Sequence, residues 1–387
     1  MKSCLTFSLL LFFGFLWAQP LRTGAEQTEV YLPILQNKKI GLVVNQTSIS
    51  EGEHLVDVLL QNQINVSKIF APEHGFRGQA DAGEKVDDSV DQATGLPIVS
   101  LYGSKRAPSM EDLNGLDLLI FDIQDVGVRF YTYISTLHYV MEACAKSGVP
   151  IMIFDRPNPN GHIVDGPILD VEYQSFVGMH PIPIAHGMTI GEYARMINGE
   201  NWLGESLKAD LQVIPCKGYN HQMPYRLPIK PSPNLPDMKS IYCYPYTCLF
   251  EGTVLSEGRG TSTPFQIFGH PAILGADRVS FVPRPNEGSK YPKLEGQECR
   301  GKSLSSQTEE ELRAIRKIDL SHLTEMYQNF PDKDQFFLKN GFFDKLAGGS
   351  QLRSQIQNGW TEEKIRASWK DGLIDFMEIR KKYLLYP

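Results

Sequence analysis

Residues 116–122 read LDLLIFD, an apolar run interrupted only by aspartates. A short run that does not alternate with polar residues is typical of a strand buried on both faces of a parallel sheet. Residues 39–45 (KIGLVVN) and 151–155 (IMIFD) have the same character. Further runs of this kind are residues 66–71, 97–101 and 211–216. Together these segments predict the strands of one parallel sheet.

Helices are predicted between these strands. They cover residues 50–60, 131–146 and about 189–198. Ser50 with Glu53 resembles a capping box at the start of the first helix. Thr189 with Glu192 resembles one at the start of the third, and Gly148 is a stop signal for the second. Strands that alternate with helices predict an α/β fold, here a Rossmann-like, doubly wound, mostly parallel sheet.

A proline-rich stretch divides the chain into two parts. Prolines occur at positions 224, 228, 231, 233 and 236, and such a segment forms neither a regular helix nor a central strand. We therefore expect a Rossmann-like N-terminal domain at residues 24–237. A smaller C-terminal α+β domain at residues 238–387 is expected to close a ligand cleft, and it should contain a helix at about residues 361–377.

The first residues resemble a secretory signal peptide. Lys2 precedes an apolar run from Leu5 to Trp17, which is followed by Ala18. The run is too short for a spanning helix of about 20 residues, although an uncleaved anchor is the alternative. We expect residues 1–18 to be removed, leaving an exported protein, periplasmic or secreted, with no integral membrane span.

Composition and missing motifs exclude several classes of function. The formal net charge is −7 and the sequence pI is about 5.8, which argues against a nucleic-acid partner because a polyanion binder needs a basic face. No G-x-G-x-x-G follows the first strand, and there is no P-loop or H-E-x-x-H. No cofactor and no metal site is therefore predicted. Five cysteines follow Cys4, so at least one thiol stays free, although Cys243 and Cys248 could pair.

Polar residues are concentrated where the predicted strands end. Ligands of open parallel sheets bind beyond the carboxyl ends of the strands, so these residues are candidates for a binding site. Isolated polar residues there would be ordinary turn residues. The candidates are Asn45, Glu73, His74, Arg77, Asp122, Gln124, Asp125, Arg129, Asp155, Arg156 and Asn158.

The second part offers one comparable segment, EGTVLSEGRGT at residues 251–261. It contains Glu251, Glu257 and Arg259 among three glycines, which suggests a backbone shaped around a ligand. A glycine-rich hairpin with solvated charges is the alternative. Carboxylates, arginine and stacking rings such as Tyr131 are the groups needed to bind a sugar and cleave a glycosidic bond.

Several motifs together resemble the exo-β-N-acetylmuramidase family. They are APEHGFRG (71–78), FDIQDVGVRFYTY (121–133), DRPNPNG (155–161), HGMTIGEYA (186–194), PSPNLP (231–236) and EGTVLSEGRGT (251–261). The resemblance covers nearly the whole chain after the first segment. It implies an exo-acting glycoside hydrolase that releases N-acetylmuramic acid from the non-reducing ends of peptidoglycan fragments, with its active site between a Rossmann-like domain and a smaller one.

Within that interpretation, Glu73 is our candidate for the general acid, and His74 would orient it or bind a sugar hydroxyl. The second catalytic carboxylate is expected to be Glu257 or Asp125, with Glu251 and Asp122 as further candidates. A fork-shaped cation should meet the lactyl carboxylate of the substrate. The first candidates for that cation are Arg129 and Arg259, and the reserves are Arg77 and Arg156.

Two other classes of function remain open from the sequence. A non-catalytic, periplasmic protein that binds sugars or muropeptides would use the same cleft and the same aromatic residues. An esterase or amidase acting on the peptide stem would need an activated nucleophile, and the chain offers no recognisable motif for one.

Overall fold

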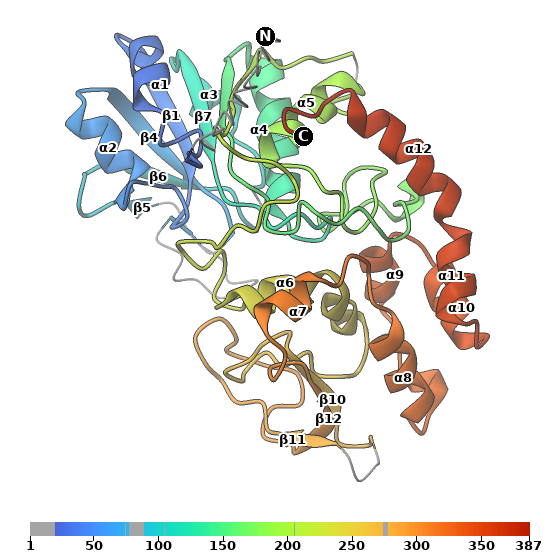
Figure 1. The fold of residues 1–387 in the computed structure, drawn as a ribbon. Helices are drawn as coiled ribbons and strands as arrows, with labels where there is room; N and C mark the ends of the chain where they lie inside the picture. Colours follow the sequence, from blue (N-terminus) through green and yellow to red (C-terminus); the bar gives the residue numbers. More distant parts are fainter. Residues whose placement is uncertain (1–19, 74, 77–88, 104, 205, 274–277) are drawn as a thin grey trace, which may run out of the picture.

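The computed structural model describes residues 20–73, 75–76, 89–103, 105–204, 206–273 and 278–387. The predicted signal peptide lies outside these residues. The chain forms two parts that lie one against the other, with the larger α/β part carrying both ends of the described chain (Figure 1). Within the described residues, no helix is both long enough and apolar enough to cross a membrane.

In the described part of the chain, the central sheet has seven strands in the order β5-β6-β4-β1-β7-β8-β9. All neighbouring strands are parallel except β5, which pairs with β6 antiparallel. Counted along the chain without β5, this is the order 3-2-1-4-5-6 of the Rossmann fold. The predicted fold class is therefore confirmed. The strands are β1 (Lys39–Val44), β4 (Asn65–Ala71), β5 (Ser89–Val90), β6 (Pro97–Ser100), β7 (Leu118–Asp122), β8 (Ile151–Phe154) and β9 (Leu211–Ile214).

Helices cover both faces of this sheet (Figure 1). Two predicted helix signals are confirmed: Gly148 ends α4 in a left-handed conformation with φ of 73°, and Thr189 with Glu192 forms the capping box of α5. The helices of this part are α1 (Thr28–Leu35), α2 (Leu55–Gln61), α3 (Met110–Leu113), α4 (Tyr133–Ser147) and α5 (Ile190–Gly199), with the short η1 (Val171–Tyr173).

The capping box predicted at Ser50 is wrong. Ser50 and Glu53 instead pair across a small hairpin of β2 (Ile49–Ser50) and β3 (Glu53–His54). The turn between them has positive φ at both Glu51 (50°) and Gly52 (90°), which suits a tight hairpin better than a helix start. The helix begins later, and the His54 ring accepts a hydrogen bond from the backbone N–H of Val56.

The C-terminal part is smaller and mixes helices with a three-stranded antiparallel sheet, β10-β12-β11. The single helix expected at residues 361–377 is two helices that meet at Trp369. The elements are α6 (Met238–Thr247), η2 (Cys248–Gly252), β10 (Ile267–His270), β11 (Val279–Phe281), β12 (Cys299–Ser303), α7 (Glu309–Arg313), α8 (Ser321–Asn329), η3 (Lys333–Gln335), α9 (Phe342–Ala347), α10 (Gln351–Gln357), α11 (Glu362–Ser368) and α12 (Lys370–Lys381).

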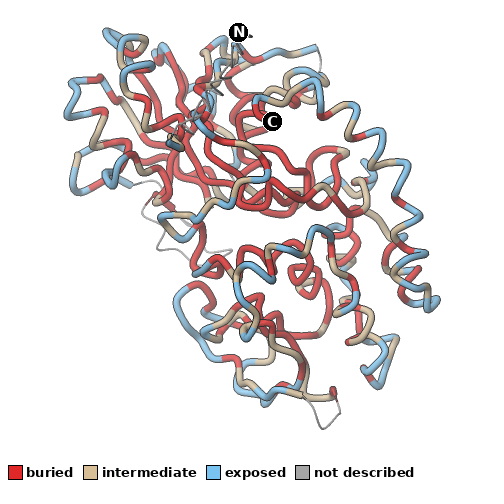
Figure 2. The backbone as a smooth tube through the Cα atoms, in the orientation of Figure 1, coloured by how far each residue is buried: buried red, intermediate tan, exposed pale blue. Residues whose placement is uncertain are grey.

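The two parts share apolar packing. The core on one face of the sheet, built around α1 and α2, stays within the N-terminal part. The core on the opposite face, under α4 and α5, continues into α6, α8 and α9 of the C-terminal part, and Figure 2 shows buried backbone on both sides of the junction. The five described cysteines are buried and free, so Cys243 and Cys248 are not paired.

Candidate active site

A cavity of about 240 Å³ lies between the two parts of the chain. The N-terminal part supplies residues that follow β4 and β6 or begin α4, and the C-terminal part supplies α6, η2, α9 and the loop after η2. The lining residues are Glu73, Tyr102, Phe130, Tyr131, Thr132, Tyr133, Phe176, Val177, Ser232, Asn234, Leu235, Tyr244, Glu251, Arg259, Phe265 and Phe342. Four residues predicted from the sequence therefore meet here: Glu73, Tyr131, Glu251 and Arg259.

Glu73 enters the cavity from the carboxyl end of β4. Its side chain is half-buried, and the hydroxyl of Thr132 donates a hydrogen bond of 2.9 Å to Glu73 Oε2. The hydroxyl of Tyr133 donates to the Glu73 backbone carbonyl at 3.4 Å. Thr132 and Tyr133 belong to the first turn of α4, so the start of this helix fixes both the backbone and the carboxylate of Glu73.

Aromatic rings form one side of the cavity. Tyr131, Tyr133, Phe130, Tyr244 and Phe265 pack edge to face, with ring centroids 4.8–6.0 Å apart. Burial raises the pKa of Tyr131 and Tyr244 well above the ordinary value, so both hydroxyls stay neutral. The hydroxyl of Tyr131 donates to the backbone carbonyl of Pro231 at 2.9 Å. The result is a fixed apolar surface with polar edges, the kind on which sugar rings pack.

The C-terminal wall carries a row of alternating charges. Arg259 Nη2 lies 2.5 Å from Glu251 Oε1, and Arg259 Nε lies 3.4 Å from Glu257 Oε1. Lys293 Nζ lies 2.8 Å from the other carboxylate oxygen of Glu257. Glu251 and Arg259 line the cavity, whereas Glu257 lies buried behind them. The structure therefore does not bring Glu257, predicted as catalytic, to the cavity surface.

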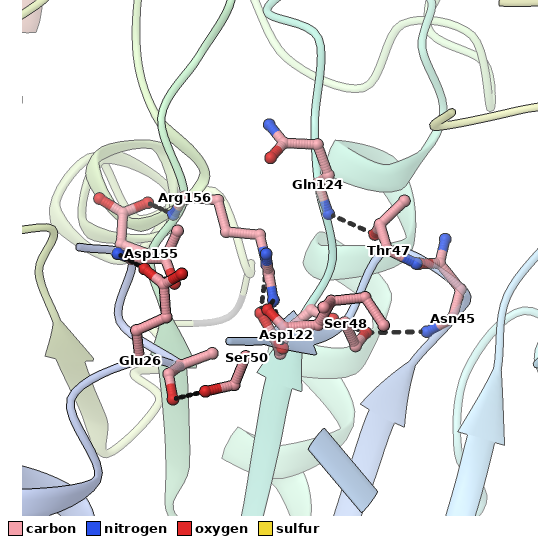
Figure 3. A network of polar contacts seen from close by, with 12 residues as sticks. Glu26, Asn45, Thr47, Ser48, Ser50, Asp122, Gln124, Asp155 and Arg156 are labelled. Carbon is pink, nitrogen blue, oxygen red and sulfur yellow. Dashed lines mark hydrogen bonds and ion pairs between the residues drawn. The ribbon is translucent and has the colours of Figure 1, made fainter. Parts of the chain in front are cut away.

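The ends of β1 and β7 form an internal network instead of a binding surface (Figure 3). The guanidinium of Arg156 donates two hydrogen bonds to Asp122, at 2.5 and 2.8 Å, and a third to the carbonyl of Ile49. Arg156 and Asp122 are only 2% and 0% exposed. The sequence predicts that both bind substrate, whereas in the structure the pair satisfies itself inside the protein and is not among the residues that line the cavity.

Asn45 and Gln124 belong to the same network and also lie off the cavity. Asn45 Oδ1 accepts hydrogen bonds from the backbone and the hydroxyl of Thr47. The backbone N–H of Gln124 donates to that hydroxyl, and its side-chain amide donates to the carbonyls of Asp125 and Pro157. Both residues therefore connect the strand ends to each other and do not line the cavity, whereas the sequence predicts that they contact the sugar.

Asp155 and Asn158 hold chain segments together rather than line the cavity. Asp155 accepts hydrogen bonds from Thr189, from the backbone of Gly191 at the start of α5, and from the hydroxyl of Tyr386 near the C-terminus. Burial raises the pKa of Asp155 to about 6. The side-chain amide of Asn158 donates to the Met188 carbonyl. The structure therefore places both residues in internal contacts, whereas the sequence predicts contacts with substrate.

Arg129 is fully buried and does not reach the cavity. Its guanidinium donates hydrogen bonds to the carbonyls of Pro167 and Ile182, and to the carbonyl of Leu346 in α9 at 3.0 Å. Burial lowers its pKa to about 9. The sequence predicts that Arg129 meets a substrate carboxylate, whereas in the structure it joins the two parts of the chain through backbone carbonyls.

Asp125 is also buried away from the cavity surface. One oxygen accepts a hydrogen bond of 2.7 Å from the backbone N–H of Gly127, and lies 3.8 Å from His186 Nε2. Burial raises the pKa of Asp125 to about 7, although the hydrogen bonds from Gly127 and Val126 lower it. A catalytic role for Asp125 is not supported by this position.

His74 and Arg77 lie outside the described residues. The sequence interpretation missed Thr132 and Lys293, which contact Glu73 and Glu257. Thr132 stands inside the quoted motif at residues 121–133, so that motif was an available signal. No such signal pointed to Lys293, because its partner Glu257 lies far from it in the sequence. Within the residues that the structure describes, no three His, Cys, Asp or Glu side chains cluster as metal ligands would.

Comparisons with known proteins place most of the chain in one family. Residues 40–239 match the family model described as exo-β-N-acetylmuramidase NamZ, N-terminal, and residues 242–386 match the C-terminal model. The peptidoglycan β-N-acetylmuramidase NamZ of Bacillus subtilis is 42% identical over an alignment of 379 residues, and the match covers 92% of this chain and 89% of the relative.

Two solved structures from Bacteroides fragilis, both described as DUF1343 family proteins, share the fold. One is 48% identical with a TM-score of 0.87, and the other is 28% identical with a TM-score of 0.79. Each comparison covers 95% of this chain and 99% of the other. On the two family models and the Bacillus relative, the chain belongs to the exo-β-N-acetylmuramidase NamZ family.

Proposed function

We propose that this protein is an exo-acting glycosidase that releases N-acetylmuramic acid from the non-reducing ends of peptidoglycan fragments during cell-wall turnover. Membership of the NamZ family supports this activity. The observation that carries it in the structure is the position of Glu73, a half-buried carboxylate that faces an aromatic wall and the Glu251–Arg259 pair across one cavity.

Glu73 is the proposed general acid. Protonation of the glycosidic oxygen by a positioned carboxylic acid is the step that lets the leaving sugar depart. Thr132 holds one carboxylate oxygen of Glu73 by donating to it. This contact fixes the direction of the carboxyl group toward the space that the aromatic rings and the C-terminal wall enclose.

The second carboxylate is proposed to be Glu251. Of the candidates Glu251, Glu257, Asp122 and Asp125, the one that lines the cavity with Glu73 is Glu251. It would act as the nucleophile at a carboxyl separation of roughly 5–5.5 Å, or as the base for an attacking water at roughly 6.5–9.5 Å. The anomer first released, observed by NMR, distinguishes these two routes.

Cleavage at a chain end fits the size of the cavity. Its volume of about 240 Å³ is below the roughly 300–1,000 Å³ typical of pockets for drug-sized ligands. A site of that size suits one terminal sugar residue rather than a long stretch of glycan.

We further propose that the protein acts after export, in the periplasm or outside the cell, since its substrate lies there.

The test is turnover of a chromogenic N-acetylmuramic acid β-glycoside by the purified protein. Cleavage is expected, and the matching N-acetylglucosamine glycoside should be cleaved far more slowly. Binding of muropeptide fragments without any release of chromophore would instead favour the non-catalytic sugar-binding protein. Release of peptide but not sugar from purified muropeptides would favour the esterase or amidase.

A further inference from the structure

Arg259 meets carboxylates at two of its three guanidinium nitrogens. A guanidinium has two edges that can each receive a carboxylate, one formed by Nε with Nη2 and one by Nη1 with Nη2. Glu257 lies at Nε, on the first edge, and Glu251 lies at Nη2, which both edges share. Within the described residues, no hydrogen bond to Nη1 of Arg259 is present.

The first edge is fixed from behind. Glu257 is 2% exposed and is held by Lys293, whose ammonium group also donates to the carbonyls of Phe250 at 2.9 Å and Thr253 at 3.2 Å. The guanidinium carbon of Arg259 lies 5.2 Å from the centre of the Phe265 ring. The side chain therefore has little freedom to turn, although 22% of it stays exposed at the cavity.

We propose that the Nη1–Nη2 edge of Arg259 is the receptor for the lactyl carboxylate of N-acetylmuramic acid, and that Glu251 competes with this carboxylate for Nη2. The proposal rests on the proposed function, because it concerns the sugar bound in the same cavity. N-acetylglucosamine has a hydroxyl where muramic acid carries its lactyl ether. Two hydrogen bonds from this edge to the lactyl carboxylate would therefore make the protein bind N-acetylmuramic acid in preference to N-acetylglucosamine.

The charges on this wall make the competition testable. The positive charges of Arg259 and Lys293 balance the negative charges of Glu251 and Glu257. When the sugar binds, its lactyl group adds a third carboxylate beside these two cations. Glu251 shares Nη2 with the incoming group and repels it. Loss of the arginine and loss of the Glu251 charge should therefore change the affinity for muramic acid in opposite directions.

The experiment is calorimetric binding of free N-acetylmuramic acid and free N-acetylglucosamine to the whole protein. Arg259→Gln should weaken binding of N-acetylmuramic acid about 10–100-fold, as expected for lost hydrogen bonds between charged groups, and change binding of N-acetylglucosamine less than about twofold. Arg259→Lys, which keeps the charge but not the fork, should lie between this variant and the wild type. Glu251→Gln should raise the ratio of N-acetylmuramic acid affinity to N-acetylglucosamine affinity several-fold.

Arg278→Lys is the matched control, since Arg278 pairs with Glu325 elsewhere in the C-terminal part. Equal weakening of both sugars in folded Arg259→Gln and Arg259→Lys would overturn the receptor, and an unchanged or lower affinity ratio in Glu251→Gln would overturn the competition. The proposed function fails separately: it is lost if the wild type binds N-acetylmuramic acid through Arg259 yet never cleaves its glycoside. It stands if the wild type cleaves that glycoside while the Arg259 variants lose both sugars equally.

Discussion

Two arginine–carboxylate pairs in this molecule look alike and differ in what surrounds them. Arg156 with Asp122 closes the ends of β7 and β8, and Arg259 with Glu251 stands on the C-terminal wall. The first pair is buried on every side, with exposures of 2% and 0%, whereas the side chains of the second are 22% and 18% exposed at a cavity. An ion pair therefore indicates a binding site only where its side chains are partly exposed at a cavity.

The same contrast explains where the ligand site lies on the sheet. In Rossmann-like folds, ligands bind at the point where the strand order reverses, which here is between β1 and β7. The β2–β3 hairpin, Arg156 and Asp122 fill that position (Figure 3). The cavity lies instead beyond β4, where Glu73 meets the first turn of α4 and the C-terminal part.

The largest effect is expected at Glu73. Glu73→Gln keeps the shape of the side chain and the bond from Thr132 but removes the transferable proton. Turnover of the muramic glycoside should fall roughly 10²–10⁴-fold, the usual contribution of general acid catalysis. Steady-state kinetics measures this, with Glu200→Gln as a control because Glu200 pairs with Tyr383 and Lys382 outside the cavity. More than about a tenth of wild-type turnover would remove Glu73 from the acid role.

The next effect tests the buried pair. Asp122→Ala leaves Arg156 charged and buried without its partner, so the free energy of unfolding should fall by about 3–5 kcal/mol. Urea unfolding followed by circular dichroism measures the change. Glu29→Ala, which removes an exposed partner of Arg22, should change it little. If both variants lose similar stability, burial does not separate the two kinds of ion pair as argued here.

The sequence predicted the sheet well because each strand is a local pattern. LDLLIFD at residues 116–122 is apolar whatever lies around it, and parallel pairing of the strands follows from their alternation with helices. The loop of Glu251 and Arg259 was also predictable, since the two are eight residues apart and face the same cavity. Local patterns of this kind need no knowledge of the tertiary structure.

The sequence could not predict in the same way which polar residues at strand ends face a ligand and which face the protein interior. Asp122 meets Arg156 from another strand end, 34 residues away, and Arg129 reaches a carbonyl 217 residues away in α9. Whether such a residue faces a ligand or the interior depends on packing between distant segments. The helix start predicted at Ser50 was wrong for a local reason, because the left-handed turn at Glu51 and Gly52 favours a hairpin over a helix start.

A smaller effect should separate Arg129 from Arg259. Arg129→Met keeps an unbranched side chain but removes the donors to three carbonyls that join the two parts of the chain. Stability should fall on the order of 1–3 kcal/mol, the cost of leaving buried polar groups unsatisfied. The ratio of binding between muramic acid and glucosamine sugars should stay unchanged. A selective loss of muramic acid binding would return Arg129 to the site.

The last prediction concerns pH dependence and is carried by Asp125. Burial raises its folded-state pKa to about 7 from an ordinary value of 3.8, so between these pH values the folded protein holds a proton that the unfolded chain has released. The stability that this proton contributes is present below about pH 3.8 and is lost as the pH rises to about 7. Asp125→Asn resembles the protonated form at every pH and lacks this loss.

Relative to the wild type, Asp125→Asn should therefore gain stability as the pH rises from about 4 to about 7, by up to about 1.4 kcal/mol per pH unit. Above pH 7 the difference should stay constant. Comparing the two proteins cancels the titration of Asp155 and of the histidines other than His186, which lies 3.8 Å from Asp125. Parallel stability curves across this range would mean that the Asp125 carboxyl is charged in the folded protein. The Asp125 carboxyl would then have access to water or to a cation, and its burial away from the cavity would be wrong.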